Sequence, residues 1–297
     1  MKEFGKLLKY NLAYIIWFFI YWLIGVYVIN GAVENVGLSC FYAALIYGVT
    51  IGVALSPIGE TILRLLEGAT PVLTQQDREY LIPIFMEVYE KARKNTPEMR
   101  RDIQLYISES MTVNAFAAGR KTIAVTRGAI ETFDREQLKG ILSHEFGHMA
   151  HNDTKALLIN LVGNGFFSLI LFALKFIMNI IQMILTVIQG KNIIFTAFWI
   201  MGWISKIFVE VMSFLFIFLG NILLSMNSVI SEGLADAYAY KIGYGEELIS
   251  SLYLLKKITL PAKMTIIEKM TATHPHIDER IQKLEQMRNV DVERLHV

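Results

Sequence analysis

The stretch "SHEFGHMAHND", residues 143–153, holds three of the six histidines of a 297-residue chain within eight positions. His144 and His148 stand four residues apart, with Glu145 between them. On an α-helix, residues four apart lie on the same face, so these two imidazoles can bind one metal ion. Glu145 lies about 100° around the helix from His144, where its carboxylate can reach a water on that ion. The stretch therefore predicts metal-assisted hydrolysis, which needs ligands for a Lewis acid and a base.

A catalytic zinc ion takes a third protein ligand and keeps a fourth position open. His151 is near in sequence, but it lies roughly 10.5 Å along a straight helix from His144, so we expect it at the surface or in a supporting role. Glu232, in "EGLADAYA" at 232–239, completes a hydrolytic set of two histidines and a carboxylate. Asp236, one turn later, would accept a ring N–H from a ligating histidine. The alternative is an ordinary exposed acidic pair at a helix start.

Composition narrows the class of protein. The apolar fraction is 54% and the mean hydropathy is +0.43, both high for a soluble protein of this length. The net charge of +1 gives no overall basic field, so no nucleic acid is expected as a partner. The single cysteine, Cys40, excludes an intramolecular disulfide and a thiolate zinc cluster.

Four apolar runs are long enough to span a bilayer, which takes about 20 apolar residues. They comprise residues 12–29, 36–55, about 157–188 and 193–224. The first could be a cleaved signal peptide, but it is longer than the usual apolar core of such peptides and another run follows directly. These features favour an uncleaved anchor. The runs predict a multi-pass membrane protein with the lipid bilayer as a partner.

Charges beside these runs predict how the chain crosses the membrane. Lys2, Lys6 and Lys9 place the N-terminus in the cytoplasm by the positive-inside rule. The active site would then face the cytoplasm from the inner cell membrane. The predicted units are an N-terminal transmembrane hairpin at 1–58, a cytoplasmic catalytic part at 59–155, a second transmembrane hairpin at 156–225 and a further cytoplasmic catalytic part at 226–297.

Three charged residues fall inside the last two runs, where charges are costly and rarely face lipid. Lys206 and Glu210 are four apart on one helix face and can pair, while Lys175 lies in the preceding run. A structural ion pair or a side chain reaching the interface is the favoured interpretation, although such residues also mark functional paths.

Capping signals predict two helices outside the runs. Thr74, with Asp77 three residues later, begins a helix over 74–94, in which Pro83 implies a kink or a later start. Asp134, with Gln137 three residues later, caps a second helix that runs directly into the histidine stretch.

A small sheet is predicted between these helices. Residues 103–107 alternate as in a half-buried strand, and two further short strands flank Gly119 as a hairpin. A last helix starts near Pro275. The expected fold class is an α+β membrane protein, mainly helical, with four transmembrane helices and a small sheet beside the histidine helix.

With these residues in place, three ordered blocks resemble the membrane zinc-protease family that includes HtpX and the CAAX prenyl proteases. The first is "NAFAAGRKTIAVTRGAIETFDREQLKGILSHEFGHMAHND" at 114–153, the second is the block at 232–239, and the third is "THPHIDERIQKL" at 273–284. The resemblance covers roughly residues 70–285. It implies a gluzincin-type HExxH catalytic helix and one zinc ion per chain.

The resemblance also implies a role for each matching residue. The zinc ligands would be His144, His148 and Glu232, with Glu145 as general base and Asp236 in support. His274 would help stabilise the oxyanion, and Arg280 would order the site. An edge strand would dock the substrate through Asn114, Ala115, Phe116 and Ala117.

The function implied is a membrane-embedded zinc endopeptidase that hydrolyses peptide bonds at the cytoplasmic face. Its substrates would be unfolded or membrane proteins, cleaved in quality control of misfolded or damaged membrane proteins. One alternative is a CAAX-type processing peptidase with narrow specificity. Another is a non-catalytic, zinc-binding membrane scaffold. Structural zinc sites are usually closed by four ligands and rich in cysteine, which favours catalysis here.

Overall fold

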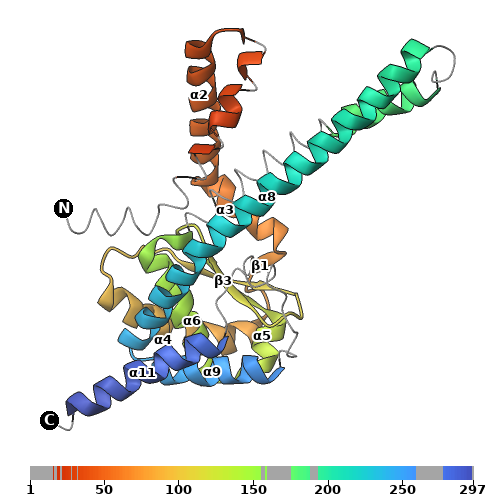
Figure 1. Cartoon of the computed structure of the whole chain (residues 1–297). Coiled ribbons are helices and arrows are strands. Elements are labelled where there is room, and N and C mark those ends of the chain that lie inside the picture. Colours follow the sequence, from red (N-terminus) through yellow and green to blue (C-terminus); the bar gives the residue numbers. More distant parts are fainter. Residues whose placement is uncertain are drawn as a thin grey trace.

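A computed structural model of the chain describes residues 33–154, 158, 175–187, 193–258 and 277–295, together with parts of 16–31. A sheet and several helices form a body, and two helical arms extend from it (Figure 1). One arm is α2 (Val36–Ala54), and the other contains the first part of α8 (Ile193–Lys241). The predicted first and third apolar runs are described only in part.

Two of the described helices are long and apolar enough to cross a membrane, namely α2 and the first 19 residues of α8, Ile193–Val211. They coincide with the predicted second and fourth runs. The helix α8 does not stop at the end of its run: its 49 residues extend for about 74 Å and end inside the body. Four membrane spans remain a prediction.

The charged residues in the second arm pair differently from the prediction. The Lys175 ammonium lies 2.7 Å from a Glu210 carboxylate oxygen, between the helix Lys175–Val187 and α8. Lys206 instead lies over the ring of Trp203, 5.2 Å from its centroid. The structural ion pair of Glu210 is therefore formed with Lys175 of the adjacent helix, and not with Lys206.

The sheet has four strands in the order β1-β2-β4-β3. They are β1 (Ala69–Pro71), β2 (Gln104–Ser108), β3 (Ala115–Ala118) and β4 (Thr122–Thr126). Strands β3 and β4 form the predicted hairpin, with Gly119 at φ +60° in its turn. Strand β2 pairs in parallel with β4, which leaves β3 at an edge of the sheet.

Two of the remaining helices, α4 and α6, begin where the predicted caps place them. The Thr74 side chain accepts the Asp77 N–H at the start of α4, and Asp134 and Gln137 form a capping box at the start of α6. Pro83 lies inside α4 without ending it. The bounds are α3 (Pro57–Leu66), α4 (Gln75–Asn95), α5 (Arg127–Thr132), α6 (Arg135–His151), α9 (Gly245–Ile258) and α11 (Ile277–Leu295).

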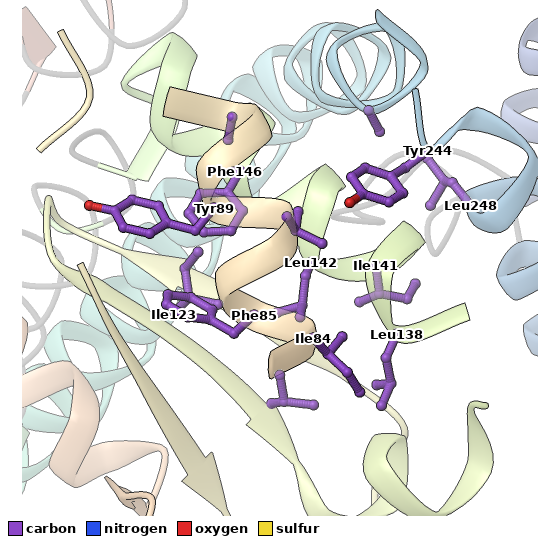
Figure 2. Packing of buried hydrophobic residues seen from close by; sticks show 14 of the residues in the cluster. Ile84, Phe85, Tyr89, Ile123, Leu138, Ile141, Leu142, Phe146, Tyr244 and Leu248 are labelled. Atoms are coloured by element: carbon purple, nitrogen blue, oxygen red, sulfur yellow. The ribbon is translucent and has the colours of Figure 1, made fainter. Parts of the chain in front are cut away.

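An apolar core fixes α6, the helix that carries the two histidines of the motif. Figure 2 shows Leu138, Leu142 and Phe146 of α6 facing the apolar side chains of α4. The ring of Phe146 packs against those of Phe85 and Tyr89, with centroids 5.5 and 5.7 Å away. Such aromatic contacts stabilise the packing beyond the burial of apolar area. The helix α6, which carries His144 and His148, is therefore held firmly against α4.

An ion-pair network joins the start of α4 to the start of α5. The guanidinium of Arg127 binds both carboxylate oxygens of Asp77, at 2.7 and 3.1 Å, and also contacts Glu109. The hydrogen bonds from Arg127 hold the pKa of Asp77 below its usual value. A carboxyl group with a depressed pKa stabilises the fold above its unfolded pKa of about 3.9, and this contribution is lost as the pH falls through the folded value.

We expect Asp77→Asn to lower the free energy of unfolding at pH 7 by on the order of 1 kcal/mol, because a charge-assisted pair is lost while the Thr74 cap remains. The deficit should shrink progressively below about pH 4, the unfolded pKa, as the pH falls toward the lower pKa at which the folded carboxylate is protonated. Thermal unfolding in detergent at pH 7 and pH 3 measures both. Asp102→Asn, which removes a half-exposed pair with Arg100, should cost less. An equal Asp77→Asn deficit at both pH values would contradict this linkage.

Candidate metal centre

Two imidazoles from α6 and one carboxylate from α8 converge at the centre of the body. The Nε2 atoms of His144 and His148 lie 3.1 Å apart. Oxygens of Glu232 lie 3.3 Å from the first Nε2 and 3.5 Å from the second. Each residue can offer one ligand atom, with all three atoms within 4.8 Å of one another. The structure thus brings together the three residues that the sequence proposes as metal ligands.

Carboxylates behind the two rings set their orientation. Nδ1 of His144 lies 2.9 Å from Asp236, and Nδ1 of His148 lies 3.2 Å from Asp153. A proton on each Nδ1 satisfies these contacts and leaves a lone pair on each Nε2. Two lone pairs facing each other across 3.1 Å repel, and a cation placed between them removes the repulsion. The donor set therefore fits a metal ion.

The electrostatics of the pocket favour positive charge at the imidazoles. Burial lowers the pKa of His148, but the carboxylates of Asp153, Glu232 and Glu145 outweigh burial and raise that pKa to about 10. Burial and the charge of Arg280 lower the pKa of His144, while Glu232 and Asp236 raise it and prevail. The negative charge that produces these shifts also attracts a divalent cation.

Arg280 of α11 joins the two carboxylates of α8. Its guanidinium binds Asp236 in a two-pronged contact, with Nη2–Oδ1 at 2.7 Å and Nε–Oδ2 at 2.9 Å. Its Nη1 lies 3.1 Å from an oxygen of Glu232. Planar, paired contacts of this kind fix direction as well as distance. The predicted ordering role for Arg280 therefore has a geometric basis, while its part in catalysis stays a prediction.

The other candidate residues of the motif region differ in whether they lie beside the three candidate ligands. Glu145 is 7% exposed, and its charge acts on His148. His151 lies outside the ligand cluster: its Nδ1 is 2.8 Å from the carbonyl oxygen of Gly147, as the helical geometry predicts. His274 lies outside the described residues.

Asp153 is a residue that sequence reasoning missed. The helix α6 ends at Asn152, which has the left-handed backbone conformation φ +64°, ψ +20°. This turn directs the next residue, Asp153, back toward His148. An acidic residue directly after the end of a histidine-bearing helix was the available signal. Ser231, whose hydroxyl lies 3.3 Å from Nδ1 of His148, gave no such signal.

The proposed substrate strand lies at the sheet edge, as expected, but only part of it is accessible. Asn114 is exposed, Ala115 and Phe116 are half-buried, and Ala117 is 5% exposed. The carbonyl of Asn114 accepts the N–H of Thr126 at 3.0 Å. By the alternation of an antiparallel ladder, the N–H groups of Ala115 and Ala117 then point away from β4. Ala115 therefore offers the accessible edge donor.

The sequence model of peptidase family M48 matches residues 75–288. The chain belongs to peptidase family M48. A "Protease HtpX homolog" of Methylacidiphilum infernorum (isolate V4) is 26% identical over 237 residues, covering 72% of this chain and 74% of that protein. A "Protease HtpX homolog" of Neisseria meningitidis serogroup B (strain ATCC BAA-335 / MC58) is 29% identical over 198 residues, covering 62% and 66% respectively. The predicted resemblance to HtpX-type membrane proteases is confirmed.

A solved structure shows the fold that this M48 chain shares. The crystal structure of S. mikatae Ste24p matches with a TM-score of 0.51 at 18% identity. The match covers 92% of this chain and 63% of the Ste24p chain, so this chain spans less than two thirds of that protein. At this identity the likeness concerns the fold alone.

A backbone-to-backbone contact sets the distance between the two elements that carry the ligands. A Cβ atom added to Gly147 of α6 would lie 2.8 Å from the Cα and 2.9 Å from the carbonyl oxygen of Ala235 in α8. Gly147 precedes His148 and Ala235 precedes Asp236, so the contact lies beside the candidate ligands. Only glycine permits this approach.

We expect Gly147→Ala to push α6 and α8 apart and to weaken metal binding by roughly tenfold or more, as loss of ligand orientation does elsewhere. Gly233→Ala is the matched control, because it stands next to Glu232 where an added Cβ meets open space. Chelator competition on purified protein measures both affinities. Equal affinities for the two variants would show that the close contact does not position the ligands.

Proposed function

We propose that the chain is a zinc-dependent endopeptidase that cleaves misfolded or damaged membrane proteins at the cytoplasmic face of the inner membrane. The observation that carries this proposal is the convergence of two imidazoles and a carboxylate beside a buried glutamate. Membership of a peptidase family supports the reaction class. Two helices able to span a membrane support the setting.

The proposed zinc ligands are His144, His148 and Glu232. When bound, zinc supplies a Lewis acid that polarises the scissile carbonyl and acidifies the attacking water. Three protein ligands leave a position for substrate, as catalytic zinc sites require. A structural-zinc scaffold is less well supported: such sites are usually closed by four ligands, often cysteines, and the chain has one cysteine.

The side chains of the site would then divide the remaining work. Glu145 takes a proton from the attacking water and passes it to the leaving amine. Asp236 and Asp153 hold the two imidazole rings in the orientation that ligation needs. Arg280 fixes the carboxylates of Glu232 and Asp236. His274 would donate a hydrogen bond to the developing oxyanion, a role that rests on the family resemblance.

The proposed topology follows from the same convergence. Residues 59–155 and 226–297 must lie on one side of the membrane, because each contributes ligands to one site. The basic N-terminal lysines favour the cytoplasmic side. Glu232 lies eight residues beyond Leu224, roughly 12 Å along α8 from the end of the predicted fourth run. A metal site at that distance would lie outside the hydrocarbon core and could meet unfolded segments of membrane proteins.

Substrate binding is proposed at the free edge of β3. An extended peptide carries unpaired N–H and C=O groups, and a sheet edge offers their complement. Main-chain pairing accepts many sequences, which suits broad cleavage of unfolded chains better than a CAAX-type activity with narrow specificity. Unfolded casein and a prenylated C-terminal peptide, each with and without chelator, separate these two activities from each other and from a scaffold.

We expect Glu145→Gln to abolish peptide hydrolysis while zinc stays bound, because the amide keeps the size of the side chain and loses its basicity. Peptide turnover and metal content should be measured on the same preparation. The wild-type protein treated with chelator is the control for metal-dependent background. Near-normal turnover by the variant would remove Glu145 from the role of general base.

A proline substitution tests whether the edge strand β3 binds substrate. Ala115→Pro removes the outward-facing N–H, so kcat/KM for an unfolded protein substrate should fall by about fivefold or more, with metal content unchanged. Ala115→Ser is the matched control, because it keeps the N–H and remains small. Unaltered kcat/KM in the proline variant, with its fold intact, would mean that β3 does not bind substrate.

A further inference from the structure

The helix α3 lies where α2 meets the body (Figure 1). One face of this helix is an exposed apolar stripe. Ile58, Ile62 and Leu65 share one face of this helix and are 60%, 36% and 76% exposed. The opposite face is buried, with Glu60 and Leu63 packed toward the β3–β4 hairpin. A short amphipathic helix directly after a membrane span is suited to lie in the membrane–water interface.

A cavity of about 310 Å³ lies beside this helix. Leu55 and Pro57, at the start of α3, line one part of its wall. The basic side chains in the wall come from three separate parts of the chain and are Arg64, Arg100, Arg120 and Lys121. Two carboxylates, Glu60 and Asp102, also line it, which leaves an excess of two positive charges. The cavity is therefore cationic where it adjoins the end of the α2 span.

The carboxylates in this wall are engaged by other groups. Glu60 accepts hydrogen bonds from the backbone N–H of Arg120 at 2.8 Å and the hydroxyl of Thr122 at 3.3 Å. Asp102 is bound by Arg100 and by Lys121, each at 2.7 Å. Among the residues that the structure describes, no partner is recorded for the exposed guanidinium of Arg120. A strong donor is thus available to an anion in the cavity.

We propose that this cavity binds the phosphate of an anionic phospholipid while α3 lies in the plane of the headgroups. Arginine guanidinium groups bind phosphate through paired hydrogen bonds and charge. A lipid fits better than a soluble anion, because Leu55 and Pro57 continue the wall toward the α2 span and the exposed stripe of α3 lies alongside. The inference goes beyond the proposed function, and lipid binding can be measured without hydrolysis.

Arg120→Gln is the sharpest variant, because its side chain is exposed and has no recorded partner whose loss would unfold the protein. Arg101→Gln is the matched control: Arg101 is an exposed arginine next to Arg100 and does not line the cavity. The full chain in non-ionic detergent is titrated with phosphatidylglycerol, phosphatidylcholine or inorganic phosphate. Native mass spectrometry counts retained lipid, and thermal unfolding reports integrity and stabilisation.

The wild type and Arg101→Gln should retain phosphatidylglycerol in preference to phosphatidylcholine. Arg120→Gln should bind phosphatidylglycerol roughly fivefold more weakly, as expected for one basic side chain at a membrane surface. Equal retention of the two lipids by the wild type would overturn the proposal, as would an unchanged affinity in Arg120→Gln. Competition by inorganic phosphate as strong as that by the lipid would assign the cavity to a soluble anion instead.

Discussion

The metal centre depends on the close approach of α6 and α8, where Gly147 meets the backbone of Ala235. This contact places four buried or half-buried carboxylates around two imidazoles. Burying so much negative charge is costly unless cations offset it. Arg280 supplies one positive charge through its contacts with Asp236 and Glu232. A divalent ion held by His144, His148 and Glu232 would offset two more of these charges, so metal binding and the packing of α6 on α8 would stabilise each other.

Features governed by neighbouring residues were predictable from the sequence. Thr74 and Asp134 cap the helices that they were expected to cap, because a cap needs only a side chain and the N–H three residues later. Gly119 turns the β3–β4 hairpin for the same local reason. The spacing of His144 and His148 placed both imidazoles on one helical face. Predicting Glu232 as the third ligand required more information, because the chain has many carboxylates. The family resemblance supported the choice of this one.

Features set by contacts distant in sequence were not predictable. Glu210 pairs with Lys175 on another helix rather than with Lys206 on its own helix, because packing across the arm decides which cation is nearer. The parallel pairing of β2 with β4 depends on the path of the chain through β3. Asp153 reaches His148 only because Asn152 adopts a left-handed conformation, which the sequence indicates weakly.

Hydropathy also hides the continuity of α8. The apolar run ends near residue 224, which suggests a boundary, yet the backbone stays helical as far as Lys241. The hydrogen bonds of an α-helix join backbone groups and do not depend on the polarity of the side chains. A helix can therefore continue from an apolar segment into a polar one without a break. One stiff element therefore carries both a candidate membrane span and Glu232. The position of Glu232 relative to α6 then depends on the tilt and depth of the candidate span in the bilayer, because both lie on the same continuous helix.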